Sequence, residues 1–173
     1  MSGMRIACML LFSTLYGLRN PGDGGRQVVI IDPSTAAIAT ISASIDPPNG
    51  TPSGVIALDR DGNRFFFAGT PGVETTPRLY TVDTSSGVVL SKPVIEASTS
   101  VQGLEYDEAE DVLYGLRTPA ASAGKQLVRY DIASGTGTVI GLTSVAIGMP
   151  SGVTTLDATG DRFFFGEPRK VDR

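Results

Sequence analysis

The chain has 173 residues, of which 41% are hydrophobic and 18% charged, so it is long enough and apolar enough to bury a core. A net charge of −4, without any long run of Lys or Arg, argues against binding to nucleic acid or to an anionic membrane surface. The absence of histidine removes the commonest general base and every His-ligated metal site, and a single cysteine excludes an intrachain disulfide.

The first predicted unit spans residues 4–42, and its start has two interpretations. An early Arg5 followed by the apolar stretch Ile6–Phe12 is compatible with a signal peptide over residues 1–18. The repeat described below assigns the same residues to strands, and we favour that assignment. The lone cysteine fits a reducing compartment such as the cytoplasm without requiring one. The strands expected in this unit are Met4–Cys8, Thr14–Leu18, Gln27–Ile31 and Ala37–Ser42.

Two complete units and a half unit follow, at residues 53–94, 102–142 and 151–166. They consist of short apolar, β-branched or aromatic runs separated by Gly, Asp or Pro, which is typical of strands. No linker divides the chain into separate domains. The expected strands are Gly54–Leu58, Arg64–Ala68, Arg78–Val82, Val88–Val94, Gly103–Tyr106, Val112–Leu116, Gln126–Tyr130, Gly137–Leu142, Gly152–Leu156 and Arg162–Gly166.

The units repeat in sequence. Pro52–Phe67 and Pro150–Phe165 are identical at 11 of 16 positions, with an offset of 150 − 52 = 98 residues. The pentapeptide LYGLR occurs at Leu15–Arg19 and again at Leu113–Arg117, and 113 − 15 is also 98. Within this period an aromatic residue followed by Gly or Ala recurs at intervals of 51, 47 and 51 residues. The pattern indicates that a module of two units was duplicated.

Four strands in each unit of roughly 49 residues predict an all-β fold, a β-propeller of four-stranded antiparallel blades with about three and a half blades in the chain. The turns Asp83–Gly87 and Asp131–Gly135 resemble the outer-hairpin motif of quinoprotein-type and YVTN-type propeller repeats. This resemblance covers nearly the whole chain and is specific for the fold. The quinoprotein group would imply a quinone cofactor, but its blades usually carry tryptophan and this chain has none. We therefore predict no cofactor.

Three and a half blades are fewer than the roughly four to eight that close a typical propeller ring. An unclosed ring leaves the apolar faces of its end blades in water. Three arrangements would resolve this: pairing with a second copy to complete one ring, membership of a longer protein, or closure alone as a four-bladed ring with a thin last blade. We favour the homodimer.

Unequal loops predict where a ligand would bind. Connections between the second and third strands of a unit, and between units, are long, and in an up-and-down blade both lie at the same end of the molecule. Arg19 and Arg117 occupy equivalent positions where the second strand reaches that end. They are the candidate ligand-binding residues, because their guanidinium groups could contact an anionic ligand. Alternatively, each pairs with a nearby carboxylate or caps loop carbonyls.

Two acidic stretches have simple structural interpretations. Asp59–Asn63 faintly resembles a calcium loop but is half the needed length, and a tight hairpin turn explains its Asp and Gly as well. Asp107–Asp111 holds four acidic residues among five, and we predict a solvent-exposed turn there. We predict no metal site.

These observations favour a binding or scaffold module that presents its loop-rich face to a small molecule, a glycan or a protein partner. The alternative is a carboxylate-dependent hydrolase or lyase acting at the channel mouth. Without histidine, its acid and base would have to be Asp, Glu, Tyr or Lys. Because the acids at the loop-bearing end form no repeated pair, we assign no catalytic residue and favour a non-enzymatic role. Those acids are Asp23, Asp46, Glu74, Glu96 and Glu167.

Overall fold

The computed structural model describes residues 14–22, 25–45, 48–49, 55–72, 74–96, 98–119, 124–143, 154–157 and 162–165. The strand expected at Met4–Cys8 and the acids Asp23, Asp46 and Glu167 lie outside these residues. All the regular elements within them are β-strands, which gives the all-β class that the sequence predicts. The described part of the chain holds no helix that is both long and apolar enough to span a membrane.

The first sheet has three antiparallel strands in the order β1-β2-β3. Its side chains alternate between two faces, as the pleat of a strand requires. Tyr16, Leu18 and Val28 turn toward the second sheet, and Leu15 turns away from it. The strands are β1 (Leu15–Arg19), β2 (Gln27–Ile31) and β3 (Ile38–Thr40).

The second sheet is antiparallel and contains the longest buried run of aromatic residues. Its inner edge is formed by two short strands, β4 and β5, which both pair with β6. The β6–β7 ladder pairs Phe67 with Tyr80, and the two rings stack with their centroids 4.5 Å apart. The strands are β4 (Pro48–Asn49), β5 (Ile56–Asp59), β6 (Arg64–Pro71), β7 (Arg78–Asp83) and β8 (Val89–Ser91).

The third sheet has four antiparallel strands in the order β12-β11-β10-β9, and the last two strands form a hairpin. The β9–β10 ladder shifts register between Leu116 and Arg117, where Gln102 is the extra residue on β9. The strands are β9 (Ser98–Asp107), β10 (Val112–Pro119), β11 (Lys125–Tyr130), β12 (Gly137–Thr143), β13 (Thr154–Asp157) and β14 (Arg162–Phe165).

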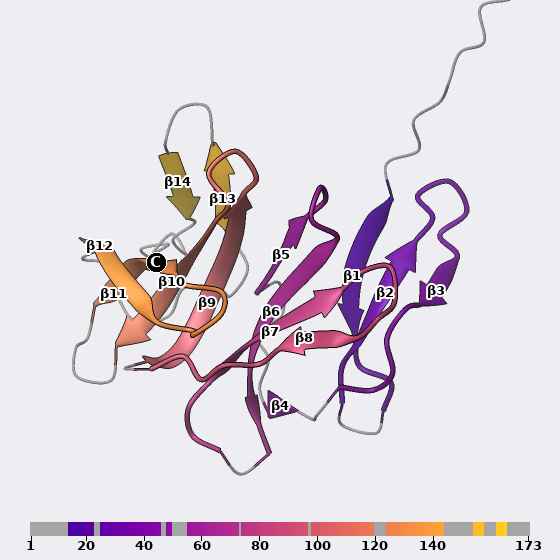
Figure 1. The fold of residues 1–173 in the computed structure, drawn as a ribbon, viewed down its shortest axis with the longest axis horizontal. Coiled ribbons are helices and arrows are strands. Elements are labelled where there is room, and N and C mark those ends of the chain that lie inside the picture. The colour runs from indigo at the N-terminus through magenta and orange to yellow at the C-terminus, as the bar shows by residue number, and fades with distance from the viewer. Residues whose placement is uncertain are drawn as a thin grey trace, which may run out of the picture.

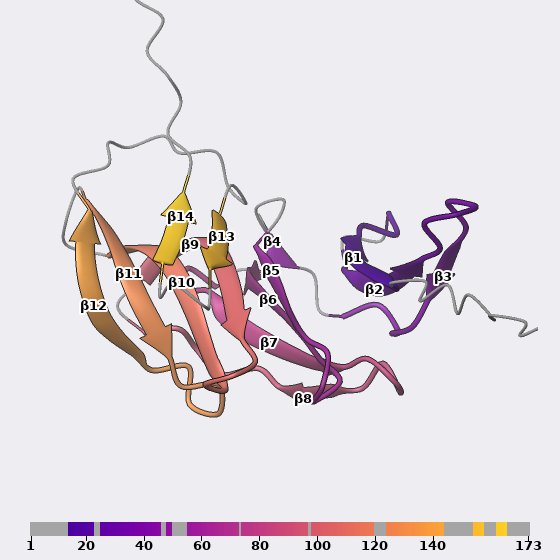
Figure 2. The ribbon, with the colours of Figure 1, turned by 90° about the horizontal axis from the view of Figure 1, so that it is seen from above.

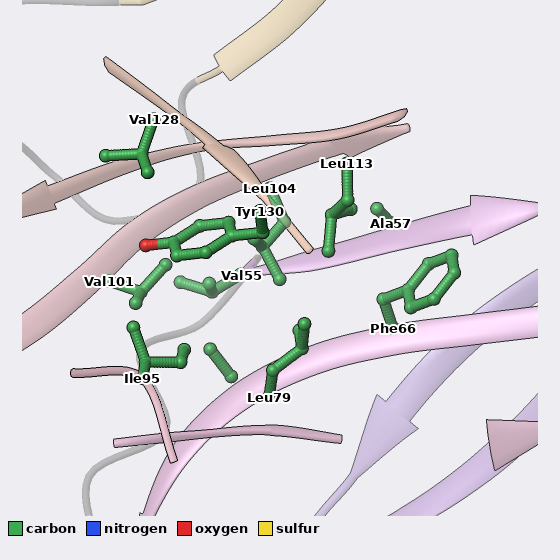
Figure 3. Close-up of a cluster of buried hydrophobic side chains, with 11 residues drawn as sticks. Val55, Ala57, Phe66, Leu79, Ile95, Val101, Leu104, Leu113, Val128 and Tyr130 are labelled. Carbon is green, nitrogen blue, oxygen red and sulfur yellow. The ribbon is translucent and has the colours of Figure 1, made fainter. Parts of the chain in front are cut away.

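The sheets lie next to one another in chain order, from β1–β3 to the β13–β14 hairpin (Figures 1 and 2). β1 contacts β5, β5 contacts β9, and β9 contacts β13, so the first strands of successive sheets are neighbours. Two hydrophobic clusters fill the spaces between the sheets. One joins the first sheet to the second, and the other joins the second to the third (Figure 3).

The triplet Phe65–Phe67 explains why the second sheet holds its neighbours together. Phe65 and Phe67 turn toward the first sheet and Phe66 turns toward the third, and all three are at most 1% exposed. Burying one such ring contributes about 1.5–3 kcal/mol. Because both faces of β6 are covered, its buried residues Phe65–Gly69 are all apolar rather than alternating with polar ones.

The repeated turn after the third strand has a physical reason for its Asp and Gly. Asp83 accepts hydrogen bonds from the hydroxyls and amides of Ser85 and Ser86, which lower its pKa to about 2. Gly87 and Gly135 both have positive φ, 72° and 74°, and a Cβ on either would collide with the backbone of the preceding sheet. The motif therefore serves close packing between sheets.

Candidate functional site

The loop-bearing end of the third sheet gathers polar side chains from three strands. Thr118, near the end of β10, lies at the centre: its Oγ1 accepts hydrogen bonds from Lys125 Nζ (2.7 Å) and Gln102 Nε2 (2.9 Å), and it lies 3.2 Å from the hydroxyl of Ser100. Gln102 Nε2 also lies 3.0 Å from Ser100 Oγ. Ser100 and Thr118 are direct partners in the β9–β10 ladder, which is why their side chains meet. We call these four residues the Lys125 cluster.

Lys125 is the charged member of the cluster and is buried, with 4% of its surface exposed. Burial lowers the pKa of its ammonium, because a charge loses solvation inside protein. Lysine is seldom buried so completely without a specific role for its charge or its donors. The loop-bearing end of β11 therefore carries a desolvated cation surrounded by hydroxyl and amide groups.

Gln102 supplies the cluster with an acceptor. Its position as the extra residue of the β9 bulge lets its amide reach Ser100 and Thr118 on the same face. Its Oε1 is buried and accepts no hydrogen bond within the described part of the chain. A buried acceptor that lacks a donor costs about 1–3 kcal/mol, so a ligand hydroxyl or N–H placed there would be stabilised.

The two arginines singled out in the sequence have the same local partner but different surroundings. Arg19 donates to Gln27 Oε1 through Nε (2.9 Å) and Nη2 (2.8 Å) and is exposed. Arg117 donates from Nε to Gln126 Oε1 (3.0 Å) and from Nη1 to the Glu96 carbonyl oxygen (3.1 Å). Arg117 is only 6% exposed, because the connection from the second sheet covers it.

The other acids expected at this end do not form a facing pair within the described residues. Glu74 receives both Arg78 Nε (2.9 Å) and Arg78 Nη2 (3.1 Å), so its carboxylate is held by a guanidinium. Glu96 is exposed, and its backbone oxygen accepts a hydrogen bond from Arg117.

Comparison with known proteins concerns the fold alone. No family model matches the sequence, and no curated protein matches it. Among solved structures, the chain is similar to TolB from Acinetobacter baumannii, with 16% identity and a TM-score of 0.62 over 92% of this chain and 36% of the TolB chain. It is also similar to a chain of the nidogen/laminin complex, with 15% identity and a TM-score of 0.52 over 80% of this chain and 47% of that chain.

Both neighbours are β-propeller proteins. The chain described here is an all-β propeller array. It spans about a third of the TolB chain and about half of the other. Its three larger sheets and its terminal hairpin are therefore blades, and β5, β9 and β13 are the blades' inner strands. The specific repeat type remains a prediction from the sequence.

A cavity of about 370 Å³ lies between the first three blades and is lined mostly by apolar and aromatic residues, together with Thr14, Arg60 and one acid. Glu105, on the inner strand β9, is that acid, and Tyr16, Ile56 and Tyr106 are among the other lining residues. Burial raises the pKa of Glu105, and the hydrogen bond donated by Thr154 Oγ1 (3.0 Å) opposes this shift. One acid in a mainly apolar cavity lacks the second carboxyl that glycoside hydrolysis needs.

At the opposite, turn-bearing end, a groove of about 810 Å³ includes two carboxylates, Asp111 and Asp131. Asp111 accepts hydrogen bonds from Tyr106 OH (2.5 Å) and Arg64 Nη2 (2.7 Å), which lower its pKa. Ser134 donates to Asp131 from its amide and hydroxyl and lowers its pKa as well. Both carboxyls are thus ionised at neutral pH, and neither suits a general acid.

The sequence did not reveal the Lys125 cluster. Its members are spread over positions 100–125, and the repeat does not reproduce them: the residues 98 positions before Gln102 and Thr118 are Met4 and Asn20. The usable signal was a lysine at the start of a buried strand opposite a threonine at the end of the preceding one. A lysine and a threonine in these positions indicate a buried cation only when the structure shows that other residues cover that end of the sheet.

Proposed function

We propose that this chain is a binding module whose ligand lies at the loop-bearing end of the third blade, and that the ligand is a small hydroxylated molecule or glycan carrying a negative charge. The observation that carries the proposal is the buried Oε1 of Gln102 beside the desolvated Lys125 ammonium. Together they offer one acceptor and a positive donor, the pair that recognises a hydroxyl next to a carboxylate.

The position of the cluster supports the same proposal. It lies at the end of β10 and the start of β11, and binding residues concentrate where the strands of a rigid scaffold end in loops. Arg117, adjacent to Thr118, adds a second buried cation to this end of the blade. Two positive groups in a low-dielectric environment raise the local attraction for an anion.

The test is a ligand titration by calorimetry with a fixed panel: glucose, glucuronate, gluconate and sulfate. We expect the hydroxylated carboxylates to bind more tightly than glucose, and Lys125→Met to weaken them about tenfold or more. Lys92→Met is the matched control, because it removes the same charge from the exposed edge of the second blade and should leave binding unchanged. Equal affinity of Lys125→Met and wild type for the carboxylates would refute the proposal.

A carboxylate-dependent hydrolase or lyase is the second candidate function. Glu105 favours it, since a half-buried carboxyl with a raised pKa in a cavity can donate a proton. Hydrolysis of aryl esters, which needs only one acid–base group, that disappears in Glu105→Gln, with the calorimetric ligands still bound, would support the enzyme over the module.

For assembly, we infer that the chain pairs with a second copy to extend its series of blades. The apolar residues at the two ends of the series support this, because large exposed apolar surfaces mark interfaces. Light scattering behind size exclusion tests the pairing: a mass of twice 18.0 kDa supports it, and the mass of one chain refutes it.

A further inference from the structure

The two ends of the blade series expose residues whose repeat equivalents are buried. Phe164 on β14 corresponds to Phe66 on β6 at the 98-residue offset, yet Phe164 is 48% exposed and Phe66 is 0% exposed. Leu15 on β1 corresponds to Leu113 on β10, and their exposures are 46% and 0%. Residues at equivalent positions of the repeat thus differ in exposure because a neighbouring blade covers one and not the other.

The internal interface shows what covers such residues. Phe66 points from the second blade toward the third, and Leu113 points from the third blade toward the second (Figure 3). They belong to one hydrophobic cluster. In the interface between blades, the Phe66 face is therefore the natural partner of the Leu113 face.

The first blade and the β13–β14 hairpin expose the same two faces. On β14, Phe164 occupies the position of Phe66. On the outer face of the first blade, Leu15 occupies the position of Leu113, and Ile38, whose counterpart at the 98-residue offset is Thr136, adds a further apolar side chain. Leu15 and Ile38 lie on one face because both pair directly with Ile31, and Ile38 is 57% exposed. The chain thus carries both halves of one interface at opposite ends of its series of blades.

We propose that these ends dock head to tail: the Phe164 face of one copy packs on the Leu15–Ile38 face of a second copy. The inference rests on the proposed pairing and adds which faces meet. The contact is heterologous, because two different surfaces meet, and with two copies it closes only if each end of one chain reaches the opposite end of the other.

The polar part of the internal interface is absent from this contact. In the second blade Arg64 Nη2 reaches Tyr106 OH (2.6 Å) and Asp111 Oδ1 (2.7 Å) of the next blade. Arg162 is the equivalent of Arg64, but the residues 98 positions before Tyr106 and Asp111 are Cys8 and Ser13. The docking is therefore apolar, and Arg162 contributes little to it.

Solution mass over a wide range of protein concentrations is the first readout. We expect Phe164→Ser and Leu15→Ser each to raise the dimer dissociation constant about tenfold or more. Arg162→Gln and Leu90→Ser should leave the mass unchanged, since Leu90 is 55% exposed but lies on the second blade. All four positions are on the surface, and far-UV circular dichroism checks that the variants fold.

Cross-linking identifies the faces. In a Cys8→Ser background, Leu15→Cys and Phe164→Cys chains are mixed and oxidised. We expect disulfide-linked dimers from the mixture and none from either variant alone. A monomeric wild type would overturn both the pairing and this inference. A dimer that survives Phe164→Ser, or that cross-links through Phe164→Cys alone, would overturn the head-to-tail contact while leaving the pairing intact.

Discussion

The second blade and the terminal β13–β14 hairpin share a sequence but not an environment. They are identical at 11 of 16 positions, and in both the arginine that begins the second strand pairs with the aspartate that ends the first: Arg64 with Asp59, and Arg162 with Asp157. The side chain of Arg64 is 26% exposed and that of Arg162 is 66% exposed. In a repeat protein, the neighbouring repeat decides how much each residue contributes.

The largest expected difference concerns the equivalent phenylalanines. Phe66→Ala leaves a cavity between two blades and should lower the free energy of unfolding by about 3–5 kcal/mol. Phe164→Ala removes a half-exposed ring and should cost less than about 1.5 kcal/mol in the monomer. Urea unfolding at low protein concentration measures both. Equal losses would mean that the hairpin is covered as fully as the second blade.

The second largest expected difference is between the losses of unfolding free energy caused by replacing the equivalent arginines, Arg64 and Arg162. Arg64 joins Asp59, Asp111 and Tyr106, and it lies over the Phe66 ring at 5.5 Å. Because Asp59 is 2% exposed and would lose its guanidinium, Arg64→Ala should cost about 2 kcal/mol. Arg162→Ala breaks an exposed pair and should cost less than about 1 kcal/mol. A double-mutant cycle of Arg64 with Asp111 measures the part of this energy that crosses between blades.

Equivalent glycines in the first and third blades extend the comparison. A Cβ on Gly115 would meet Tyr130 Cε2 at 2.5 Å, whereas on Gly17 it would have ordinary contacts of 3.5 Å with Ile31 and Val29. Gly115→Ala should therefore cost about 1–2 kcal/mol, and Gly17→Ala should be nearly neutral. Thermal unfolding of the two variants side by side checks this. A neutral Gly115→Ala would show that the Tyr130 ring moves freely.

The smallest effect tests the contact between the hairpin and the third blade. Burial raises the pKa of Glu105, with Thr154 opposing the shift, so folding favours the protonated carboxyl. Its stabilising contribution is present below the unfolded pKa and declines as pH rises through the higher folded pKa. Glu105→Gln should remove this decline and stabilise the protein at pH 7 by less than about 1 kcal/mol. Unfolding measured from pH 4 to pH 8 would reveal it; an unchanged pH profile would contradict the burial of Glu105.

Much of the strand pattern could be predicted from the sequence, because the repeat reinforces each local signal. β2 was expected and found over the same residues, Gln27–Ile31. β9 was expected at Gly103–Tyr106 but runs from Ser98 to Asp107. Its first residues are polar and show no strand periodicity, and they pair with the end of β10 only past the bulge. β8 is shorter than expected and ends at Ser91, before Lys92 and the proline that follows it.

The candidate site was less predictable, because burial there is decided by packing between blades. Arg19 and Arg117 follow the same four residues, and each donates to a glutamine on the next strand, yet only Arg117 is covered. The Lys125 cluster has no repeated pattern, and a lysine at a strand start is usually exposed. Their binding role is thus a proposal that solution experiments must test.

Hydrogen exchange measured by mass spectrometry would compare β6 with β14 most directly. At protein concentrations where the chain is monomeric, we expect the amides of Arg64–Pro71 to be protected and those of Arg162–Phe165 to exchange quickly. Raising the concentration should protect Arg162–Phe165 and leave β6 unchanged, because docking covers only the ends of the blade series. Two results would contradict this account: equal protection of both strands in the monomer, or a β14 that stays unprotected in the dimer. Either would mean that coverage by a neighbouring blade does not explain the difference between β6 and β14.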